Sequence, residues 1–487
     1  MANIRYYTLI RLFCIALCFC TLLTGCKNDT TKQASSGNSA TTTPTISNDS
    51  TNPTQSAGTE NIPTNPTDPS APTTPTISQE EIDQLATELL RETDFISAGY
   101  DYEIAIQKLK DFPYLDRVPS LQQKIQEYEY ADSQLVTYSN MQNITHIFFH
   151  SLIVDTNRAF DKGYSSDGYN LYFATVDEFN AILEELYKRD FVLVTPYQVA
   201  QEVADESGTR FVYGKIRLPE GKKPFIMSQD DLNYYSYMIN GADGTGSTPV
   251  FAAKYGDGFA HKIVIGADGH PTCEYMDADG NITTGDYDLV PCLETFIQKH
   301  PDFAYKGARA VLGVTGYEGV LGYRTKPEFA QAMGAEAYQK EVEQAKAVVQ
   351  CLKEHGWIIA SHSYGHPAYG SISAERVQID SDKWEKNVQP IVGDCDIILY
   401  PHGSDIAGIG RYTFDNAKFK TLYDAGYRYF FNVDGNIYWS QLGSNYYRGG
   451  RRNIDGYRMW HNPELLADLF EVSEVFDKAR PTPVPNI

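Results

Sequence analysis

Two histidines four residues apart are the residues of this chain whose types and spacing most clearly suggest chemistry. They are His362 and His366, and they follow the short apolar run 357–360. A run of this length is typical of a buried strand. If the chain enters a helical turn after the strand, both imidazoles point the same way, as two ligands of one metal do. An isolated pair more often caps a strand end. A catalytic zinc takes three protein ligands, so a third is needed.

A pair of aspartates offers that third ligand. Asp230 and Asp231 end the apolar segment 224–228, which is also strand-like. Seen alone, paired aspartates at a strand end usually belong to a turn. Seen together with the later histidine pair, they make a mixed nitrogen and oxygen ligand set available for a divalent cation.

The surrounding elements explain how residues so far apart in sequence come together. Strand-like apolar runs alternate with amphipathic helices, which favours an α/β fold whose parallel sheet is covered by helices and closed into a barrel. In such a barrel the carboxyl ends of the strands meet on one face. The residues at these ends are Asp230, Asp231, His362, His366, the Tyr400-Pro401 corner and Asp434; the strand-like runs are 144–149, 191–194, 224–228, 357–360, 397–400 and 429–433.

The order of these motifs resembles that of the polysaccharide deacetylase family (NodB-homology domains, carbohydrate esterase family 4). The Asp-Asp pair and the His-x-x-x-His segment are similar to its first two motifs, and 400–403 (Tyr-Pro-His-Gly) is similar to its third. The path from His150 through a helix at Phe179 to Asp230 resembles the branch that deacetylates poly-N-acetylglucosamine. This resemblance implies a distorted (β/α) barrel over residues 144–475.

The resemblance also implies roles. Asp230 would be the catalytic base, and Asp231, His362 and His366 would bind a divalent metal, most often Zn²⁺. The nearest candidate for the general acid is His461, which equally fits a surface histidine before Asn462-Pro463. A bound cation that polarises an amide and acidifies water agrees with these roles. Substrate-binding positions carried over from the family are Tyr400, Pro401, His402 and Asp434.

Three departures from the family pattern bear on function. Gln229 and Leu232 replace a phenylalanine and a glycine around the aspartates, and His402 replaces an aromatic residue. The first hypothesis is an N-deacetylase that releases acetate from an N-acetylated polysaccharide of the peptidoglycan or poly-N-acetylglucosamine type. The alternative suggested by the departures is a catalytically weak or inactive glycan-binding lipoprotein on the same fold.

The first 77 residues predict export and anchoring. Arginines 5 and 11, an apolar run and Leu-Thr-Gly before Cys26 indicate a signal peptide over 1–26 and resemble a bacterial lipobox. Cys26 would then carry lipid and hold the protein at the cell membrane, facing outside the cytoplasm. Residues 27–77 are almost all small or polar and predict a disordered tether.

The remaining segments carry no recognisable chemistry. Residues 78–133 predict a short helical segment, and 239–290 predict a set of hairpins inserted into the barrel domain. A disulfide between Cys273 and Cys292 is one option for an exported protein. The formal charge of −22 argues against a nucleic-acid partner.

Overall fold

The computed structural model describes residues 77–163, 165–206, 208–239, 256–434 and 438–487. The predicted signal peptide, the lipid site at Cys26 and nearly all of the predicted tether lie outside the described residues. Among the described residues, no helix combines the length and the apolar character needed to span a membrane.

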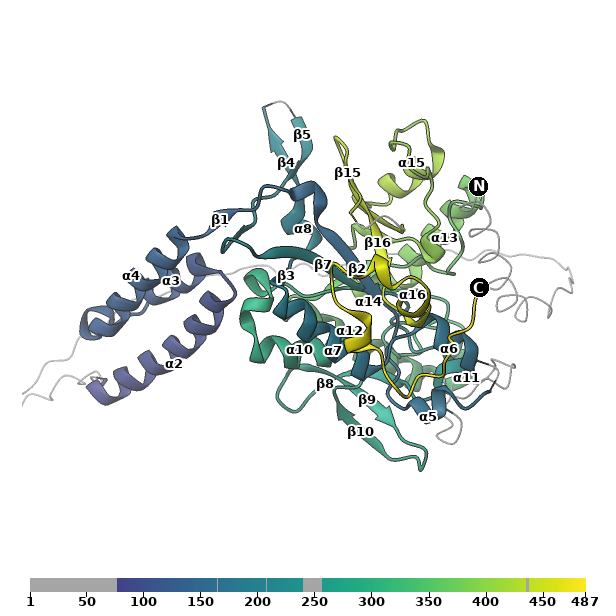
Figure 1. Ribbon diagram of the computed structural model, residues 1–487, viewed down its shortest axis with the longest axis horizontal. Coiled ribbons are helices and arrows are strands. Elements are labelled where there is room, and N and C mark those ends of the chain that lie inside the picture. Colours follow the sequence, from purple (N-terminus) through teal and green to yellow (C-terminus); the bar gives the residue numbers. More distant parts are fainter. Residues whose placement is uncertain (1–76, 164, 207, 240–255, 435–437) are drawn as a thin grey trace, which may run out of the picture.

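Seven parallel strands close into a barrel, which confirms the predicted fold class (Figure 1). The ring closes because β11 pairs with β7 as well as with β12. A further strand, β3 (Phe191–Leu193), pairs with β7 outside the ring. In ring order the strands are β11 (Val311–Val314), β12 (Ile358–Ser361), β13 (Ile397–Leu399), β14 (Tyr429–Val433), β16 (Tyr447–Asn453), β2 (Thr145–Phe149) and β7 (Lys223–Gln229).

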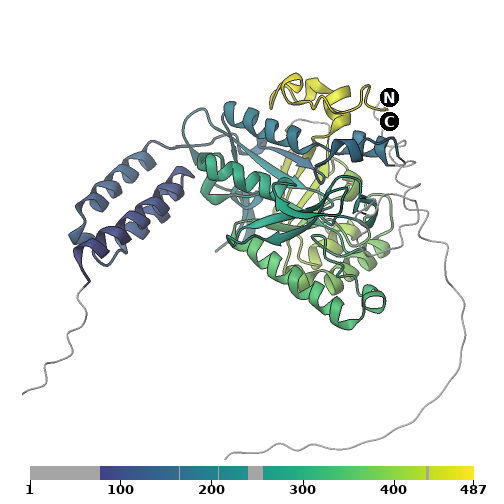
Figure 2. The same cartoon turned by 90° about the horizontal axis from the view of Figure 1, so that it is seen from below.

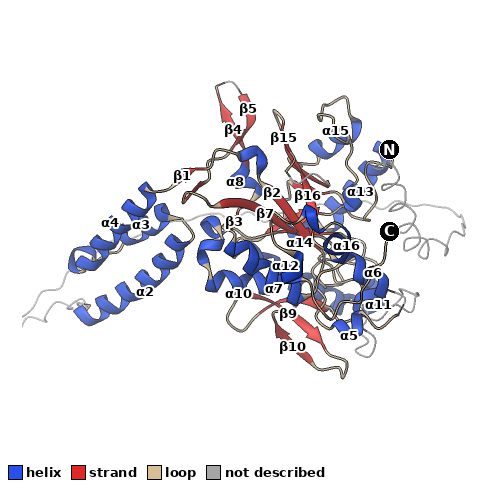
Figure 3. Ribbon diagram, viewed as in Figure 1, coloured by secondary structure: helices blue, strands red, loops and turns tan. Residues whose placement is uncertain are grey.

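Helices surround the barrel and the C-terminal segment lies on one side of it (Figures 2 and 3). A capping box of Thr175 and Glu178 begins α7, which buries its apolar face against the sheet. The main helices are α7 (Val176–Lys188), α10 (Leu289–Lys299), α12 (Ala335–Glu354), α13 (Ala374–Asn387) and α15 (Ala417–Asp424). The shorter ones are α5 (Thr156–Ala159), α6 (Ser166–Tyr172), α8 (Pro196–Val199), α9 (Ser236–Ile239), α11 (Phe329–Met333), α14 (Gln389–Val392), α16 (Gly456–His461) and α17 (Val472–Val475).

The barrel interior contains polar as well as apolar side chains, which come from alternate residues of the strands. His146 bonds to Ser228 across the β2–β7 pair, and its ring meets Phe431 of β14. Above them, the Arg451 guanidinium lies over the Phe148 ring. Because alternate residues of a strand point to the same side, the next inward residue after Phe148 is His150, at the carboxyl end of β2.

The N-terminal helices form an arm that projects from the barrel (Figure 1). They are α2 (Gln79–Ala98), α3 (Tyr102–Lys110) and α4 (Pro119–Ser133), and they share a small apolar core of their own. At the base of the arm, Nη1 of Arg217 donates hydrogen bonds of 2.8 and 3.0 Å to the two carboxylate oxygens of Asp132. That contact is next to the short pair of β1 (Val136–Thr137) and β6 (Arg217–Leu218).

Three antiparallel strands make up the described part of the segment predicted as inserted hairpins. They are β8 (Ala260–Ile265), β9 (Pro271–Met276) and β10 (Ile282–Gly285), and α10 follows them. Cys273 and Cys292 are both buried here as free thiols, so the structure does not contain the disulfide considered from sequence. A second antiparallel pair, β4 (Ala200–Asp205) and β5 (Gly208–Tyr213), and β15 (Ser440–Leu442) beside β16 complete the strands.

Candidate metal centre

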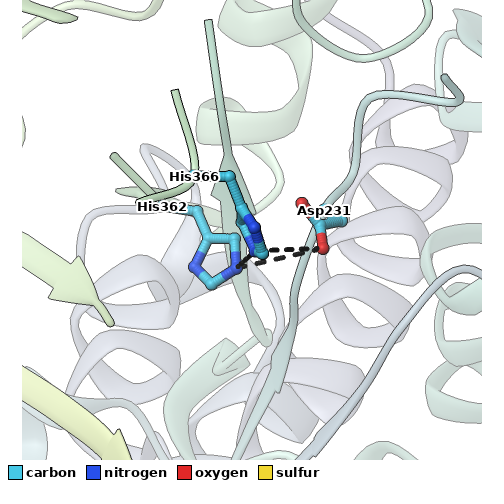
Figure 4. A group of neighbouring side chains, drawn as sticks. All are labelled: Asp231, His362 and His366. Atoms are coloured by element: carbon cyan, nitrogen blue, oxygen red, sulfur yellow. Dashed lines mark hydrogen bonds and ion pairs between the residues drawn. The ribbon is translucent and has the colours of Figure 1, made fainter. Parts of the chain in front are cut away.

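Asp231, His362 and His366 converge at the carboxyl ends of β7 and β12 (Figure 4). One ligand atom from each lies within 4.8 Å of the others. The Asp231 Oδ2 atom is 3.6 Å from Nε2 of His366 and 4.0 Å from Nε2 of His362. Two imidazole nitrogens and one carboxylate oxygen are a donor set that zinc accepts while keeping a position open.

The loop that carries the two histidines is not helical, so the predicted helical turn is wrong. Ser363 and His366 have positive φ angles of 64° and 56°. The Asp380 carboxylate accepts the backbone N–H groups of Tyr364 and Gly365, and the Ser363 hydroxyl accepts that of His366. The imidazoles therefore meet because of a loop held by side chains and not because of helical spacing.

Neighbouring groups orient two of the three candidate ligands for a cation, and burial keeps the third neutral. The Nδ1–H of His362 donates to the Leu399 carbonyl at 2.7 Å, which leaves Nε2 as the lone-pair nitrogen. The Tyr235 hydroxyl donates to Oδ1 of Asp231 at 2.6 Å, which leaves Oδ2 toward the histidines. Burial lowers the pKa of His366 to about 3, so its ring is neutral at neutral pH. The residues present thus fit a divalent metal.

Asp230 is a second carboxylate that the same turn places beside the ligands. It is buried, and Arg451 of β16 donates two bonds to it at 2.5 and 2.9 Å. Burial by itself would raise the pKa of Asp230, but the guanidinium of Arg451 outweighs it and holds the pKa below its usual value. Its Oδ2 atom is 3.8 Å from Nε2 of His362, close enough to act on anything bound at the ligands.

His150 is a residue near the candidate site that the sequence interpretation used for the motif order but gave no role. It is half-buried at the end of β2, and its Nδ1 lies 3.0 Å from the Tyr172 carbonyl. Its position follows from the strand register, because Phe149 pairs with Gln229 and the backbone N–H of Asp230 donates to the Phe149 carbonyl, so His150 follows β2 beside Asp230. The strand at 145–149 could have revealed it. Alternate residues of a strand point to the same side, so His150, two residues after Phe148, points into the barrel as Phe148 does.

His402 also lies against the ligands. Its ring centroid is 4.4 Å from that of His366, and its Nε2 is 3.2 Å from the His366 carbonyl oxygen. Tyr400 is completely buried, and its hydroxyl bonds to Tyr412, so its ring belongs to the core behind β13. Pro401 is buried as well, and the backbone N–H of Asp434 donates to the Arg451 carbonyl.

His461 occupies a different environment from the ligands. Its Nε2 lies 3.1 and 3.0 Å from the carbonyl oxygens of Val484 and Pro485 near the C-terminus. Within the described part of the chain, no contact joins His461 to Asp230, Asp231 or the histidine pair. The structure therefore places His150, and not His461, beside Asp230.

The departure at Leu232 leaves the turn intact. The positive φ angle falls on Asp231, at 58°, and the Leu232 side chain is completely buried in the main core. The backbone of Leu232 pairs with Gly313 and Leu321. The backbone of Leu232 thus links the aspartate turn by hydrogen bonds to β11 and to the loop after it.

Comparisons with known proteins give a likeness to solved structures and to no family model. No protein-family model and no curated protein matches this chain. A solved structure of the Streptococcus pyogenes deacetylase PplD in complex with acetate aligns with a TM-score of 0.32 and 13% sequence identity, over 68% of this chain and 98% of that chain.

Proposed function

We propose that this protein is a metal-dependent N-deacetylase of the polysaccharide deacetylase family. Its substrate would be an N-acetylated cell-surface or cell-wall polysaccharide, of the peptidoglycan or poly-N-acetylglucosamine type, and its product acetate. The observation that carries the proposal is the convergence of Asp231, His362 and His366, with Asp230 as a separate buried carboxylate beside them. Hydrolysis of an unactivated amide needs an electrophile and a base placed in this way.

The residues divide the work of amide hydrolysis between them. A divalent cation such as Zn²⁺ held by Asp231, His362 and His366 supplies Lewis acidity toward the amide carbonyl and toward water. Asp230, kept ionised and oriented by Arg451, takes the proton of the attacking water. The carbon–oxygen bond forms and the carbon–nitrogen bond breaks. His150, protonated at Nε2 while Nδ1–H donates to the Tyr172 carbonyl, gives the leaving amine its proton.

Location at the membrane is part of the proposal. The lipobox-like sequence ending at Cys26 supports a lipid anchor that faces outside the cytoplasm, where an N-acetylated envelope polymer is found. Cell fractionation of the full chain and of a Cys26→Ser variant tests it. Loss of the variant from the membrane fraction is expected, and equal membrane association of the two would contradict the anchor.

Acetate release is the experiment that tests the activity. The full chain, loaded with Zn²⁺, is incubated with N-acetylglucosamine oligomers and with peptidoglycan, with and without chelator. We expect acetate only in the absence of chelator. Asp230→Asn should lower kcat by about 10²- to 10⁴-fold, because the base is lost.

The metal content of the Asp230→Asn variant is the control for that experiment. Asp230 is not among the three ligands, so the variant should still bind one equivalent of metal. Full activity in Asp230→Asn would remove Asp230 from the role of base. A loss of activity that merely follows a loss of metal would mean that Asp230 acts as a ligand.

A further inference from the structure

Asp288 is a completely buried carboxylate outside the residues discussed so far. It is the N-cap of α10, and its Oδ1 accepts the backbone N–H groups of Leu289 and Leu152 at 2.8 and 2.9 Å. The same oxygen accepts the Gln229 side-chain amide at 2.8 Å, and Oδ2 accepts the Tyr234 hydroxyl at 2.6 Å. We call Asp288 and these four donors the Asp288 network.

The donors belong to the chain segments that carry the candidate catalytic groups. Gln229 directly precedes Asp230, and Tyr234 lies three residues after Asp231. Leu152 lies two residues after His150, and the Gln229 amide also approaches the His150 carbonyl at 3.4 Å. One carboxylate therefore ties the exit of β2 to the exit of β7.

The hydrogen-bond donors around Asp288 show which protonation state of its carboxyl group the network fits. Four donors and no cation contact this side chain within the described residues, so an ionised carboxylate, which only accepts, satisfies all of them. Gln229 Oε1 is buried without a hydrogen-bond partner in the same part of the chain. The glutamine thus contributes through its amide donor, although burying its oxygen is unfavourable.

We propose that Asp288 is a positioning residue that sets His150 against Asp230 and Asp231. The inference rests on the proposed function for what these groups do, and on the hydrogen bonds alone for how they are held. It also explains Gln229, because a phenylalanine there has no donor for Asp288.

Asp288→Asn is the variant that tests the proposal with least change in shape. Its amide oxygen still accepts from Leu152, Gln229 and Leu289, while its amide nitrogen meets the Tyr234 hydroxyl, which loses its acceptor. The turn from Asp231 to Tyr234 should then shift. Misplacement on the ångström scale costs up to about 100-fold, so we expect kcat to fall by about 10- to 100-fold with KM within about two-fold.

Cobalt binding supplies a measurement that does not depend on turnover. Co²⁺ replaces the native metal, and its visible absorption reports ligand placement. We expect Asp288→Asn to weaken Co²⁺ binding by about 10-fold, because groups that orient ligands affect metal affinity to this extent. Tyr234→Phe removes the same hydrogen bond. The double variant should therefore bind Co²⁺ no more weakly than the single variant that has the lower Co²⁺ affinity.

Glu294→Gln is the matched control. Glu294 is a buried carboxylate of the same helix, but it bonds to Arg309 and Trp357, away from the site. This variant should lower the melting temperature and leave both kcat and Co²⁺ affinity unchanged.

The outcomes separate the two proposals. An Asp288→Asn protein with kcat and Co²⁺ affinity within two-fold of wild type would overturn the positioning role, as would changes no larger than those of Glu294→Gln. If the wild-type protein releases no acetate, the proposed function fails, while the Co²⁺ titrations still decide whether Asp288 positions the site.

Discussion

Arg451 and Asp230 show how single residues decide what this site can do. A carboxylate with so little exposure would lose its proton reluctantly on its own. The two bonds from Arg451 reverse that tendency and fix both oxygens. Asp231, one residue later, is instead held by a neutral hydroxyl and faces the histidines. Two adjacent carboxylates thereby acquire different surroundings, which suit the proposed roles of Asp230 as base and Asp231 as ligand.

Tyr235 makes a prediction at this scale. Tyr235→Phe removes the hydrogen bond to Oδ1 of Asp231 and frees the carboxylate to rotate. Zinc affinity should fall by about 10- to 100-fold, as is typical when a group that orients a ligand is lost. Competition with a chromophoric chelator measures it.

Tyr237→Phe is the control for Tyr235→Phe. The Tyr237 ring stacks on that of Tyr235 at a centroid distance of 5.8 Å, and the substitution keeps this stack. Its zinc affinity should match that of wild type. Equal affinities in all three proteins would show that the Tyr235 hydroxyl does not orient the ligand.

The strands determine how closely these residues approach, and Gly313 of β11 lies at a point with little room. A Cβ at Gly313 would meet Leu399 Cδ1 at 2.9 Å, the Gln229 carbonyl oxygen at 3.2 Å and Asp230 Oδ1 at 3.5 Å. The absence of a side chain here lets β7 and β11 pair and close the barrel beside the base.

Gly313→Ala should therefore impair both stability and turnover. Overpacking a tight interior typically costs about 1–3 kcal/mol, and the neighbours that must give way are the Leu399 side chain and the carbonyl of Gln229, which directly precedes Asp230. Urea denaturation and kcat measure the two effects. Gly168→Ala is the control, since a Cβ there meets nothing within 4 Å and lies in α6, where alanine favours the helix. Unchanged kcat in Gly313→Ala would show that β11 does not restrain Asp230.

The elements also show where sequence patterns suffice and where they do not. Apolar runs predicted strands at β2, β7, β12, β13 and β14, because each is buried on both faces. Two ring strands were not predicted: β11, although it is apolar and buried, and β16. The β16 strand was missed because it includes Arg448, Arg451 and Arg452, all buried but each bonded to backbone or carboxylate groups. Hydropathy cannot reveal a strand whose buried charges are compensated by partners distant in sequence.

The site was predictable to a similar extent. The three ligands and Asp230 follow strand ends, so motif order located them and the structure brings them together. The position of His461 beside the C-terminal segment, and that of His150 beside Asp230, depend on how the strands pair in the ring. That pairing is a property of the tertiary structure and is not encoded in local spacing.

For the whole molecule, buried titratable groups couple the fold to pH. Burial holds the pKa of His146 well below its usual value. Below about pH 6.5 the unfolded chain binds a proton at His146 and the native protein does not. The contribution of His146 to the free energy of unfolding therefore falls by about 1.4 kcal/mol for each unit of decreasing pH. Asp288 and Asp257, whose pKa values burial raises to about 6, act in the opposite direction between about pH 4 and 6.

The difference between wild type and His146→Asn isolates the contribution of His146. In chelator, the free energy of unfolding of the wild type should decrease more steeply from pH 6 to pH 5 than that of the variant, by about 1.4 kcal/mol. Urea denaturation at both pH values measures it. Parallel pH dependence in the two proteins would mean that His146 is protonated in the native barrel.

Metal titration coupled to acetate release tests the central claim most directly. Zinc is added stepwise to metal-free protein in the presence of an N-acetylglucosamine oligomer, with His362→Ala treated in the same way. We predict that acetate release rises in proportion to zinc up to one equivalent and is absent in the variant at every step. Zinc that binds in one equivalent and produces no acetate from the oligomers or from peptidoglycan would contradict the assignment of this site to N-deacetylation.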